Sequence, residues 1–286
     1  MQIAILGTGA MGSRMAARLL EVGHHVTVFN RHPHTAQALV MQGAVFAATP
    51  AAAVRDAEVV LAMLTDDAAS RQVWLDERDG ALAAMGPDAL ALECSTLSVA
   101  WCDELAACFQ ARHSAFLDAP VVGSRPQAEA GALIFLVGGD AAALARATSV
   151  LDCLGAGVHH VGPAGSATRL KLAVNALFGI QVAALGELTA WLAAEGLDHR
   201  QTLARFAELP TTSPALAGIA ALMAGEDTAP RFPIALVAKD FGYAMQAATE
   251  QGAALPLTQA TQAIYRQAVD AGLGGLNING VAELYT

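Results

Sequence analysis

The first half of the chain alternates short apolar runs with stretches in which apolar residues recur at helical spacing. The first pair is the run 2–6 and the segment 11–22, in which Met11, Met15 and Leu19 fall on one helical face. The alternation continues with predicted strands at 25–29, near 45, and at 58–64, 89–93, 115–118, 132–137 and 157–161, and with predicted helices near 35–42, after Pro50, and at 98–112 and 141–154. Helices that alternate with apolar strands predict an α/β domain with a doubly wound parallel sheet.

The second half shows helical patterns and no convincing strand. Gly162-Pro163 punctuates the chain, so we predict a domain 1–163 followed by an all-α domain 164–286. The predicted helices are 166–194, near 199–207, 215–224, 233–251 and 256–271. The first of them imitates a membrane span, but polar residues such as Asn175 and Glu187 interrupt it. We expect a long helix buried between the two domains.

A glycine-rich turn, GTGAMG at residues 7–12, separates the first predicted strand from the first predicted helix. In a GxGxxG turn of this kind, the first glycine allows the tight turn and the second lets the backbone approach a diphosphate. The third lets helix and strand pack closely. The diphosphate would lie at the N-terminus of the helix, where backbone amides and the helix dipole favour anions. The turn therefore predicts a Rossmann-type dinucleotide-binding domain with contacts at Gly7, Gly9, Ala10, Met11 and Gly12. The alternative is a glycine-rich turn that binds nothing.

The residues after the second predicted strand indicate which dinucleotide is bound. Enzymes that use NAD usually carry Asp or Glu there for the ribose hydroxyls, whereas this chain has Asn30 followed by Arg31. A guanidinium can pair with the 2′-phosphate of NADP, and no carboxylate stands there to repel it. We predict NADP(H) in preference to NAD(H), with NAD as the second possibility. Arg31 as an ordinary solvated arginine is the other interpretation.

Two further strand ends are candidate ligand contacts, because ligands of doubly wound sheets bind beyond the carboxyl ends of the strands. One is followed by Leu64 and Thr65 and the other by Ser95 and Thr96. Ser95 and Thr96 could equally serve as N-caps of the helix predicted at 98–112.

The loop at residues 119–131 is long for a simple connection and contains two prolines and two glycines. Long loops at a sheet edge often carry function. Its Gly123 and Ser124 offer backbone amides and a hydroxyl to a small anion such as a carboxylate.

Lysine is rare in this chain, because 14 of its 16 cationic residues are arginines and only Lys171 and Lys239 are lysines. A lysine amine can release its proton, whereas a guanidinium stays charged. Lys171 and Asn175 lie four residues apart on the predicted long helix and share one face. An amine and a carboxamide side by side can donate a proton to a carbonyl oxygen and orient it. The alternative for both lysines is a solvated helix face.

The composition narrows the class of partner. A formal charge of −10 and the lack of any run of Lys or Arg argue against a nucleic-acid surface. The four cysteines form no CxxC pair and have no His partner at metal-ligand spacing, so we predict no metal site and a reducing compartment. We see no signal peptide, and we expect a cytoplasmic protein that binds no membrane. The sparsely charged helical half predicts association into a homodimer or homotetramer.

Together these features resemble the β-hydroxyacid dehydrogenase family, which includes 3-hydroxyisobutyrate dehydrogenase and the glyoxylate and succinic semialdehyde reductases. The resemblance covers essentially the full length and rests on GTGAMG, Ser95-Thr96, the DAPVVGSRPQAEAG loop from Asp118, the KLAVN segment from Lys171, and Lys239-Asp240. It implies that Lys171 is the catalytic lysine and that Asn175 assists it. The predicted cofactor contacts beyond the glycine turn are Asn30, Arg31, Leu64, Thr65, Thr96 and Lys239, and the predicted substrate contacts are Ser95, Gly123 and Ser124.

The resemblance implies hydride transfer between NADPH and a small carbonyl acid or aldehyde, with Lys171 as general acid and base. The Asn30-Arg31 pair and the GSRPQAEAG sequence of the loop most resemble the NADPH-dependent glyoxylate and succinic semialdehyde reductase branch of the family. Val122 stands where the family's substrate loop commonly has serine, and Ala167 stands where a glycine often precedes the lysine. A larger or less polar carbonyl compound is therefore an alternative substrate.

Two other functions share this architecture. Imine reductases usually carry Asp or Tyr at the position of the lysine, so Lys171 counts against that class. A catalytically silent dinucleotide-binding protein would bind NADPH without oxidising it.

Overall fold

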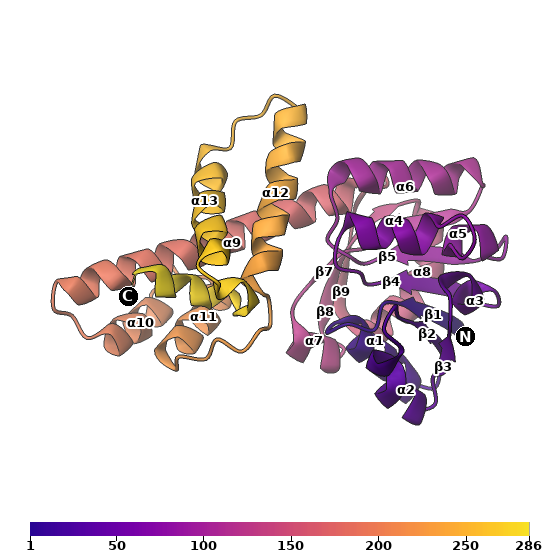
Figure 1. Cartoon of the computed structure of the whole chain (residues 1–286), viewed down its shortest axis with the longest axis horizontal. Coiled ribbons are helices and arrows are strands. Elements are labelled where there is room, and N and C mark those ends of the chain that lie inside the picture. Colours follow the sequence, from indigo (N-terminus) through magenta and orange to yellow (C-terminus); the bar gives the residue numbers. More distant parts are fainter. Residues whose placement is uncertain (286) are drawn as a thin grey trace. The chain divides into compact units, whose positions relative to one another are not determined.

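The computed structural model describes residues 1–285 and divides into two compact units, Met1–Lys171 and the residues from Leu172 onward (Figure 1). The division falls inside a continuous helix, whereas the predicted boundary is Gly162-Pro163. Residues 166–171 of that helix belong to the first unit, and a continuous helix offers no turn residue that would mark the division in the sequence.

The first unit is built on a nine-stranded sheet. Its strands are β1 Gln2–Leu6, β2 His25–Phe29, β3 Val45–Ala47, β4 Val59–Ala62, β5 Leu90–Glu93, β6 Ala115–Asp118, β7 Val121–Val122, β8 Leu133–Gly139 and β9 Gly155–Gly162. The order β3-β2-β1-β4-β5-β6-β8-β7, with β9 paired to β8, begins with the 3-2-1-4-5-6 order of the Rossmann fold. The predicted Rossmann-type fold is thus confirmed.

One end of this sheet differs from the all-parallel prediction. β8 runs antiparallel to β6 and β7, while β9 pairs with β8 in parallel. β7 has only two residues, too few to give an apolar pattern, and it pairs Val121 with Phe135. A long loop was expected here, so both β7 and the short helix α7 Arg125–Glu129 were missed.

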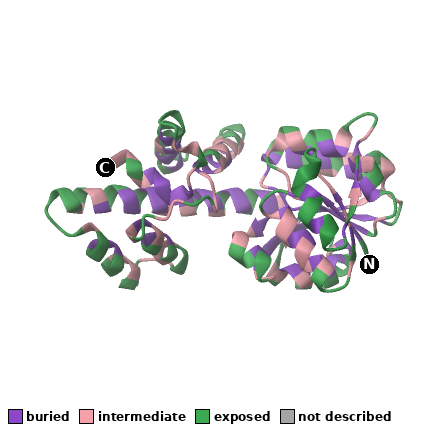
Figure 2. Cartoon of the chain, turned by 60° about the horizontal axis from the view of Figure 1, so that its bottom comes forward, coloured by how far each residue is buried: buried purple, intermediate pink, exposed green. Residues whose placement is uncertain are grey.

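Helices cover both faces of the sheet because successive residues of its central strands alternate between two cores. Ile3 and Ile5 of β1 join one core, and Ala4 and Leu6 join the other. The first core is closed by α1 Gly12–Glu21, α2 Gln37–Met41, α7 and α8 Ala141–Leu154; the second is closed by α3 Pro50–Val54, α4 Asp67–Leu75, α5 Ala81–Ala84 and α6 Val99–Ala111. A short 3₁₀ helix, Pro33–Ala36, precedes α2. Figure 2 shows the buried strands between partly exposed helices.

Among its described residues, the second unit consists of helices joined by loops, as predicted, with one isolated β-bridge between Pro233 and Asn277. It contains most of α9 Ser166–Ala194, then α10 His199–Glu208, α11 Pro214–Ala224, α12 Ile234–Glu250 and α13 Pro256–Asp270, and two 3₁₀ segments, Leu273–Gly275 and Ile278–Tyr285. The 3₁₀ segments were not predicted from the sequence, because they are short and lack an extended helical pattern. The core contains Val182, Phe241 and Tyr265, and the Tyr265 hydroxyl donates a 2.9 Å hydrogen bond to the carbonyl of Gly179.

Helix α9 is the one described helix that is long and apolar enough to cross a membrane by length and composition. A third of its most apolar window is buried. The predicted burial of this helix holds for only part of its surface, since Leu177 is 59% exposed and Trp191 is 58% exposed.

Candidate active site

Four of the predicted ligand-binding segments meet at one edge of the sheet. β2, β1, β4 and β5 are neighbours and run parallel, so the residues that follow them leave the sheet on the same side. These residues are the glycine turn 7–12, Asn30-Arg31, Leu64-Thr65 and Ser95-Thr96. The structure therefore brings together residues that lie up to 89 positions apart in the sequence, from Gly7 to Thr96.

The structure gives a different reason for glycine at each of the three glycine positions of the GTGAMG turn. Gly7 has a φ of +103°, and a Cβ added to it would lie 2.4 Å from the carbonyl oxygen of Met63. A Cβ on Gly12 would lie 2.0 Å from the carbonyl oxygen of Gly7, so helix α1 can approach the turn only without a side chain there. A Cβ on Gly9 would meet nothing within 4 Å. The open space over Gly9 is the feature that a bound diphosphate requires.

The N-terminus of α1 also fits an anion. Its cap residue, Met11, makes no side-chain capping hydrogen bond. The Ser13 and Arg14 amides already donate to the carbonyls of Gly9 and Met11, so the amides of residues 10–12 are the ones that can face an anion. Arg14 braces the turn by donating a 2.7 Å hydrogen bond to the carbonyl of Ala10. These features fit the diphosphate of a dinucleotide at the helix N-terminus.

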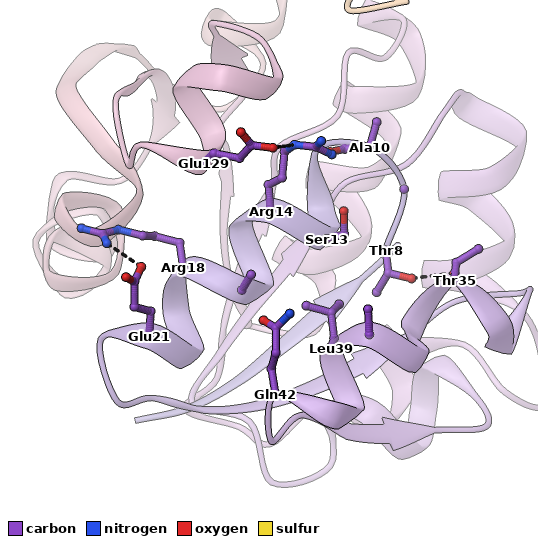
Figure 3. A pocket seen from close by; sticks show the side chains of 13 residues that line it. Thr8, Ala10, Ser13, Arg14, Arg18, Glu21, Thr35, Leu39, Gln42 and Glu129 are labelled. Atoms are coloured by element: carbon purple, nitrogen blue, oxygen red, sulfur yellow. Dashed lines mark hydrogen bonds and ion pairs between the residues drawn. The ribbon is translucent and has the colours of Figure 1, made fainter.

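An open cavity of about 760 Å³ lies beside the glycine turn, between α1 and α2 (Figure 3). Of the predicted cofactor contacts, it is lined by Gly9 and Ala10. Its two arginines are paired with carboxylates, Arg14 with Glu129 at 2.6 Å and Arg18 with Glu21 at 2.7 Å. The cavity thus borders the predicted dinucleotide edge without covering it, and its charges are locally balanced.

A buried carboxylate joins the two strand-end loops after β4 and β5. Glu93 is 1% exposed, and it accepts hydrogen bonds from the Ser95 amide at 3.0 Å, the Trp74 indole at 2.8 Å and the Ser70 hydroxyl at 2.9 Å. The Ser95 hydroxyl in turn accepts a 2.7 Å hydrogen bond from the Leu64 amide. Burial raises the pKa of the Glu93 carboxyl, and the hydrogen bonds from Ser95, Trp74 and Ser70 act in the opposite direction.

The alternative role of Ser95 and Thr96 as helix caps is wrong. Ser98 caps α6 by accepting a 3.1 Å hydrogen bond from the Trp101 amide. Ser95 is buried with its hydroxyl held by Leu64, whereas Thr96 is half-buried. Contacts of Ser95 with substrate and of Thr96 with cofactor stay predictions.

The segment after β2 is shaped locally. The Asn30 carboxamide oxygen accepts a 2.9 Å hydrogen bond from the His32 amide, which turns the chain at this point. Arg31 is exposed next to it. Thr35 returns to the glycine turn, where its hydroxyl lies 2.8 Å from that of Thr8 (Figure 3).

The loop after β6 holds two of the three predicted substrate contacts, Gly123 and Ser124. Gly123 has a φ of +125°, and a Cβ on it would lie within 3.1 Å of both Leu133 and Gln127. The Ser124 amide, at the start of α7, donates a 3.0 Å hydrogen bond to the Gln127 side chain. Backbone geometry thus requires glycine at position 123, whether or not the loop binds an anion.

Lys171 and Asn175 lie on the buried stripe of α9, and they are 8% and 7% exposed. The stripe runs through Thr168, Leu172 and Ala176 at helical spacing, which places Lys171 and Asn175 one turn apart, about 6 Å along the axis. A lysine on a buried stripe is not a solvated cation. The alternative interpretation of Lys171 as a residue on a solvated helix face is therefore wrong.

Asn175 and Lys239 meet the same carboxylate. Asn175 Nδ2 donates a 2.6 Å hydrogen bond to Asp240 Oδ2, and Lys239 Nζ lies 3.0 Å from Asp240 Oδ1, at ion-pair distance but outside hydrogen-bond geometry. Asp240 is 3% exposed, and Lys239 Nζ also lies 4.6 Å from the centre of the Tyr243 ring. The ion pair is therefore largely buried, and contact of Lys239 with a cofactor stays a prediction.

The buried contacts of three carboxylates, Glu93, Asp118 and Asp240, were not predicted from the sequence, although Asp118 and Asp240 lie in the motifs that carry the family resemblance. Glu93 and Asp118 each end an apolar strand, in LALE and AFLD. A carboxylate at the end of an otherwise apolar run was the available signal, because such a group needs hydrogen-bond donors once it is buried. Among residues 1–285, no group of three or more His, Cys, Asp or Glu side chains is arranged to hold a metal ion.

Comparison with known proteins agrees with this architecture. Residues 2–162 match the NAD binding domain of 6-phosphogluconate dehydrogenase, and residues 165–285 match the NAD-binding domain of NADP-dependent 3-hydroxyisobutyrate dehydrogenase. The chain is 32% identical to an NAD-dependent L-serine dehydrogenase of Pseudomonas aeruginosa, over 99% of this chain and 97% of the relative. It is 29% identical to glyoxylate/succinic semialdehyde reductase 1 of Arabidopsis thaliana, over 99% and 98%.

A solved structure of Mycobacterium tuberculosis 3-hydroxyisobutyrate dehydrogenase with L-serine is similar throughout. It superposes with a TM-score of 0.90 at 31% identity and covers 99% of this chain and 98% of its own. The fold and the glycine-turn edge define a dinucleotide-dependent oxidoreductase. The chain belongs to the β-hydroxyacid dehydrogenase family. It is an NAD(P)-dependent hydroxyacid dehydrogenase that binds a nicotinamide cofactor and acts on a small-molecule substrate.

Proposed function

We propose that this enzyme transfers a hydride between NADPH and a small carbonyl acid or aldehyde, with Lys171 as the general acid and base. The observation that carries the proposal is the placement of Lys171 on the buried stripe of α9, one turn before Asn175, in a chain with only one other lysine. When bound, the nicotinamide supplies or accepts the hydride at the carbonyl carbon.

In the reductive direction, Lys171 donates a proton to the carbonyl oxygen as negative charge develops there, and its ammonium group stabilises that charge. Asn175 orients the same oxygen. Asp240 holds one N–H of the Asn175 carboxamide, so the second N–H and the amide oxygen are the groups that can face a substrate. In the oxidative direction, the Lys171 amine accepts the proton of the substrate hydroxyl.

The substrate loop supports a small anionic group in a less polar setting than the family usually provides. Val122 lies in β7 and pairs with Ile134. Its apolar side chain stands at the position where the substrate loop of the family commonly has the hydroxyl of a serine. Ala167 is fully buried, and its methyl group takes the place of the usual glycine. We propose a substrate of the semialdehyde, glyoxylate or 3-hydroxy acid class, with a larger and less polar carbonyl compound as the second choice.

A cofactor-oxidation screen tests the proposal. The enzyme is mixed with NADPH and glyoxylate, succinic semialdehyde, tartronate semialdehyde, apolar aldehydes or cyclic imines, and with NADP and 3-hydroxyisobutyrate or L-serine for the reverse direction. We expect turnover of a carbonyl acid or aldehyde. Turnover of imines alone would assign an imine reductase, and NADPH binding without oxidation by any compound would assign a silent dinucleotide-binding protein.

The preference for NADPH is the second part of the proposal, and Arg31 supports it. Arg31 is exposed beside the turn that Asn30 makes with His32, with no carboxylate at the end of β2. The name of the NAD-dependent relative from P. aeruginosa points the other way for that protein. Measuring whether this enzyme prefers NADPH or NADH therefore tests the proposal that Arg31 binds the 2′-phosphate of NADPH.

We expect Arg31→Ala to lower kcat/KM for NADPH by about tenfold, because one charge-assisted contact to the 2′-phosphate is lost. The value for NADH should change by less than about twofold, since NADH has no such phosphate. Steady-state kinetics with each cofactor measure both. Arg55→Ala removes another exposed arginine of the same unit and should leave both values unchanged. A wild-type enzyme that is more efficient with NADH would end the proposal.

Self-association is also proposed, as a homodimer or homotetramer. The exposed apolar side chains Leu177, Leu188 and Trp191 of α9 support it, because a stripe of this kind seldom stays in water. Sedimentation at micromolar concentration is expected to give a multiple of the 29.3 kDa chain. A monomer at that concentration would contradict the proposal. A cytoplasmic location stays a prediction from the sequence.

A further inference from the structure

The N-terminus of α9 is capped by a carboxylate from another element. Asp118, the last residue of β6, is completely buried. Its Oδ1 accepts a 2.7 Å hydrogen bond from the Gly165 amide, and its Oδ2 accepts a 2.8 Å hydrogen bond from the Thr168 amide. Both carboxylate oxygens thus accept hydrogen bonds from amides at the start of the helix. These amides lie 47 and 50 residues after Asp118 in the sequence.

This contact is an N-cap supplied from outside the helix. The first amides of a helix have no intrahelical partner, and a carboxylate there gains from charge-assisted hydrogen bonds and from the helix dipole. The position of the carboxylate is closely defined, because a Cβ on Gly138 of β8 would lie 2.3 Å from Asp118 Oδ1. Gly165, which leads into the helix, has a φ of +86°.

The same turn of α9 is held a second time, from α6. Arg169 binds Asp103 through both guanidinium nitrogens, at 3.0 and 2.7 Å, and the Thr168 hydroxyl lies 3.2 Å from Cys102 Sγ. Lys171 follows Thr168 by three residues on the buried stripe of the helix. The axial position and rotation of the turn at Thr168 therefore determine where the Lys171 side chain starts.

We propose that Asp118 is a positioning residue for catalysis, which sets the register of α9 and hence the place of the Lys171 amine. Asp118 also begins the segment 119–124, which holds Gly123 and Ser124, two of the three predicted substrate contacts. One buried carboxylate thus fixes the start of that loop and the start of the helix that carries the lysine. This inference rests on the proposed function, because it acts through Lys171.

Asp118→Asn is the first test. Asparagine has the same size, but only its oxygen can accept an amide hydrogen, so its amino group faces one of the two donors at Gly165 and Thr168. We expect kcat to fall by about tenfold, since small misplacements of a reacting group have effects of that order or larger. The Kd for NADPH alone, measured by fluorescence, should stay within about twofold. Hydrogen exchange of the peptide covering 164–170 should become faster.

Two matched variants separate positioning from general stability. Asp140→Asn makes the same substitution at another helix cap of the same unit, where Asp140 accepts hydrogen bonds from the Ala142 and Ala143 amides of α8, and it should leave kcat within about twofold. Asp118→Ser offers a smaller neutral cap. It gives the same readouts if Asp118→Asn folds poorly, and its kcat is expected below that of the wild type.

The decisive measurement combines Asp118→Asn with Lys171→Ala. If Asp118 acts through the lysine, the double variant should be no slower than Lys171→Ala alone. A further loss of the same factor in the double variant, or an unchanged kcat in both Asp118 variants, would overturn the positioning role while the proposed function stands. A normal kcat in Lys171→Ala would overturn the proposed function, and this inference with it.

Discussion

Lys171→Ala is expected to lower kcat by a factor on the order of 10² or more, since general acid catalysis by one group typically contributes roughly 10² to 10⁴. Binding of NADPH alone should change little, because the predicted contacts with the diphosphate and the 2′-phosphate lie elsewhere, at the glycine turn and Arg31. Steady-state kinetics with the best substrate of the screen give kcat, and fluorescence titration gives the Kd for NADPH.

Lys171→Arg distinguishes proton donation from charge. Arginine keeps a cation on the helix but does not titrate in the working pH range, so it should restore little of the lost rate. Leu170→Ala is the matched control, since it truncates the preceding, 40% exposed side chain of the same helix. It should leave kcat near that of the wild type. A folded Lys171→Ala enzyme with nearly normal kcat would remove Lys171 from the mechanism.

The fold was predictable where a local pattern specifies it. β1, β2, β4, β5 and β6 are apolar runs close to the predicted ranges, and α10 to α13 begin and end within one residue of their predicted bounds. One face or both faces of each of these elements are buried, so the spacing of hydrophobic residues predicts the type and the bounds of the element. The direction of β8 is a different matter, because an apolar strand has the same pattern whether it pairs in parallel or antiparallel.

The candidate site was predictable as a set of loops but not as a set of contacts. The ends of β1, β2, β4 and β5 could be placed at one edge because parallel strands of a doubly wound sheet share that edge. The partners of Glu93, Asp118 and Asp240 could not be found in this way. Most of their donors come from other elements, as with the Asp118 carboxylate and the Thr168 amide, and no local pattern in the sequence encodes such a pair.

The rarity of lysine identified two residues with different surroundings. Lys171 lies on the buried stripe of α9, as expected for a residue with a specific role. Lys239 is engaged by Asp240 and Tyr243 within the second unit. Both lysines are thus partly or fully buried. The rarity of lysine alone does not distinguish an amine that takes part in the reaction from an amine that forms an ion pair within the fold.

The second large effect is expected at the glycine turn, where Gly12→Ala and Gly9→Ala should fail in different ways. In Gly12→Ala, the new Cβ would lie 2.0 Å from the carbonyl oxygen of Gly7, and neither the turn nor α1 can accommodate it without moving. We expect a loss of stability of about 1–3 kcal/mol or more, as for overpacking in a core. Binding of NADPH should be lost as well, because the turn itself is displaced. Thermal melting of the apo enzyme and fluorescence titration measure the two effects.

Gly9→Ala should separate binding from folding. Its Cβ meets nothing within 4 Å and its φ is not in the left-handed region, so the melting temperature of the apo enzyme should be that of the wild type. The methyl group would occupy the space where a diphosphate approaches the backbone, so the Kd for NADPH should rise by about tenfold or more. Gly86→Ala, at another glycine with open surroundings, is the control and should change neither quantity. If Gly9→Ala bound NADPH normally, the diphosphate could not lie over this turn, and the Rossmann interpretation of the cofactor edge would have to be replaced even though the fold is unchanged.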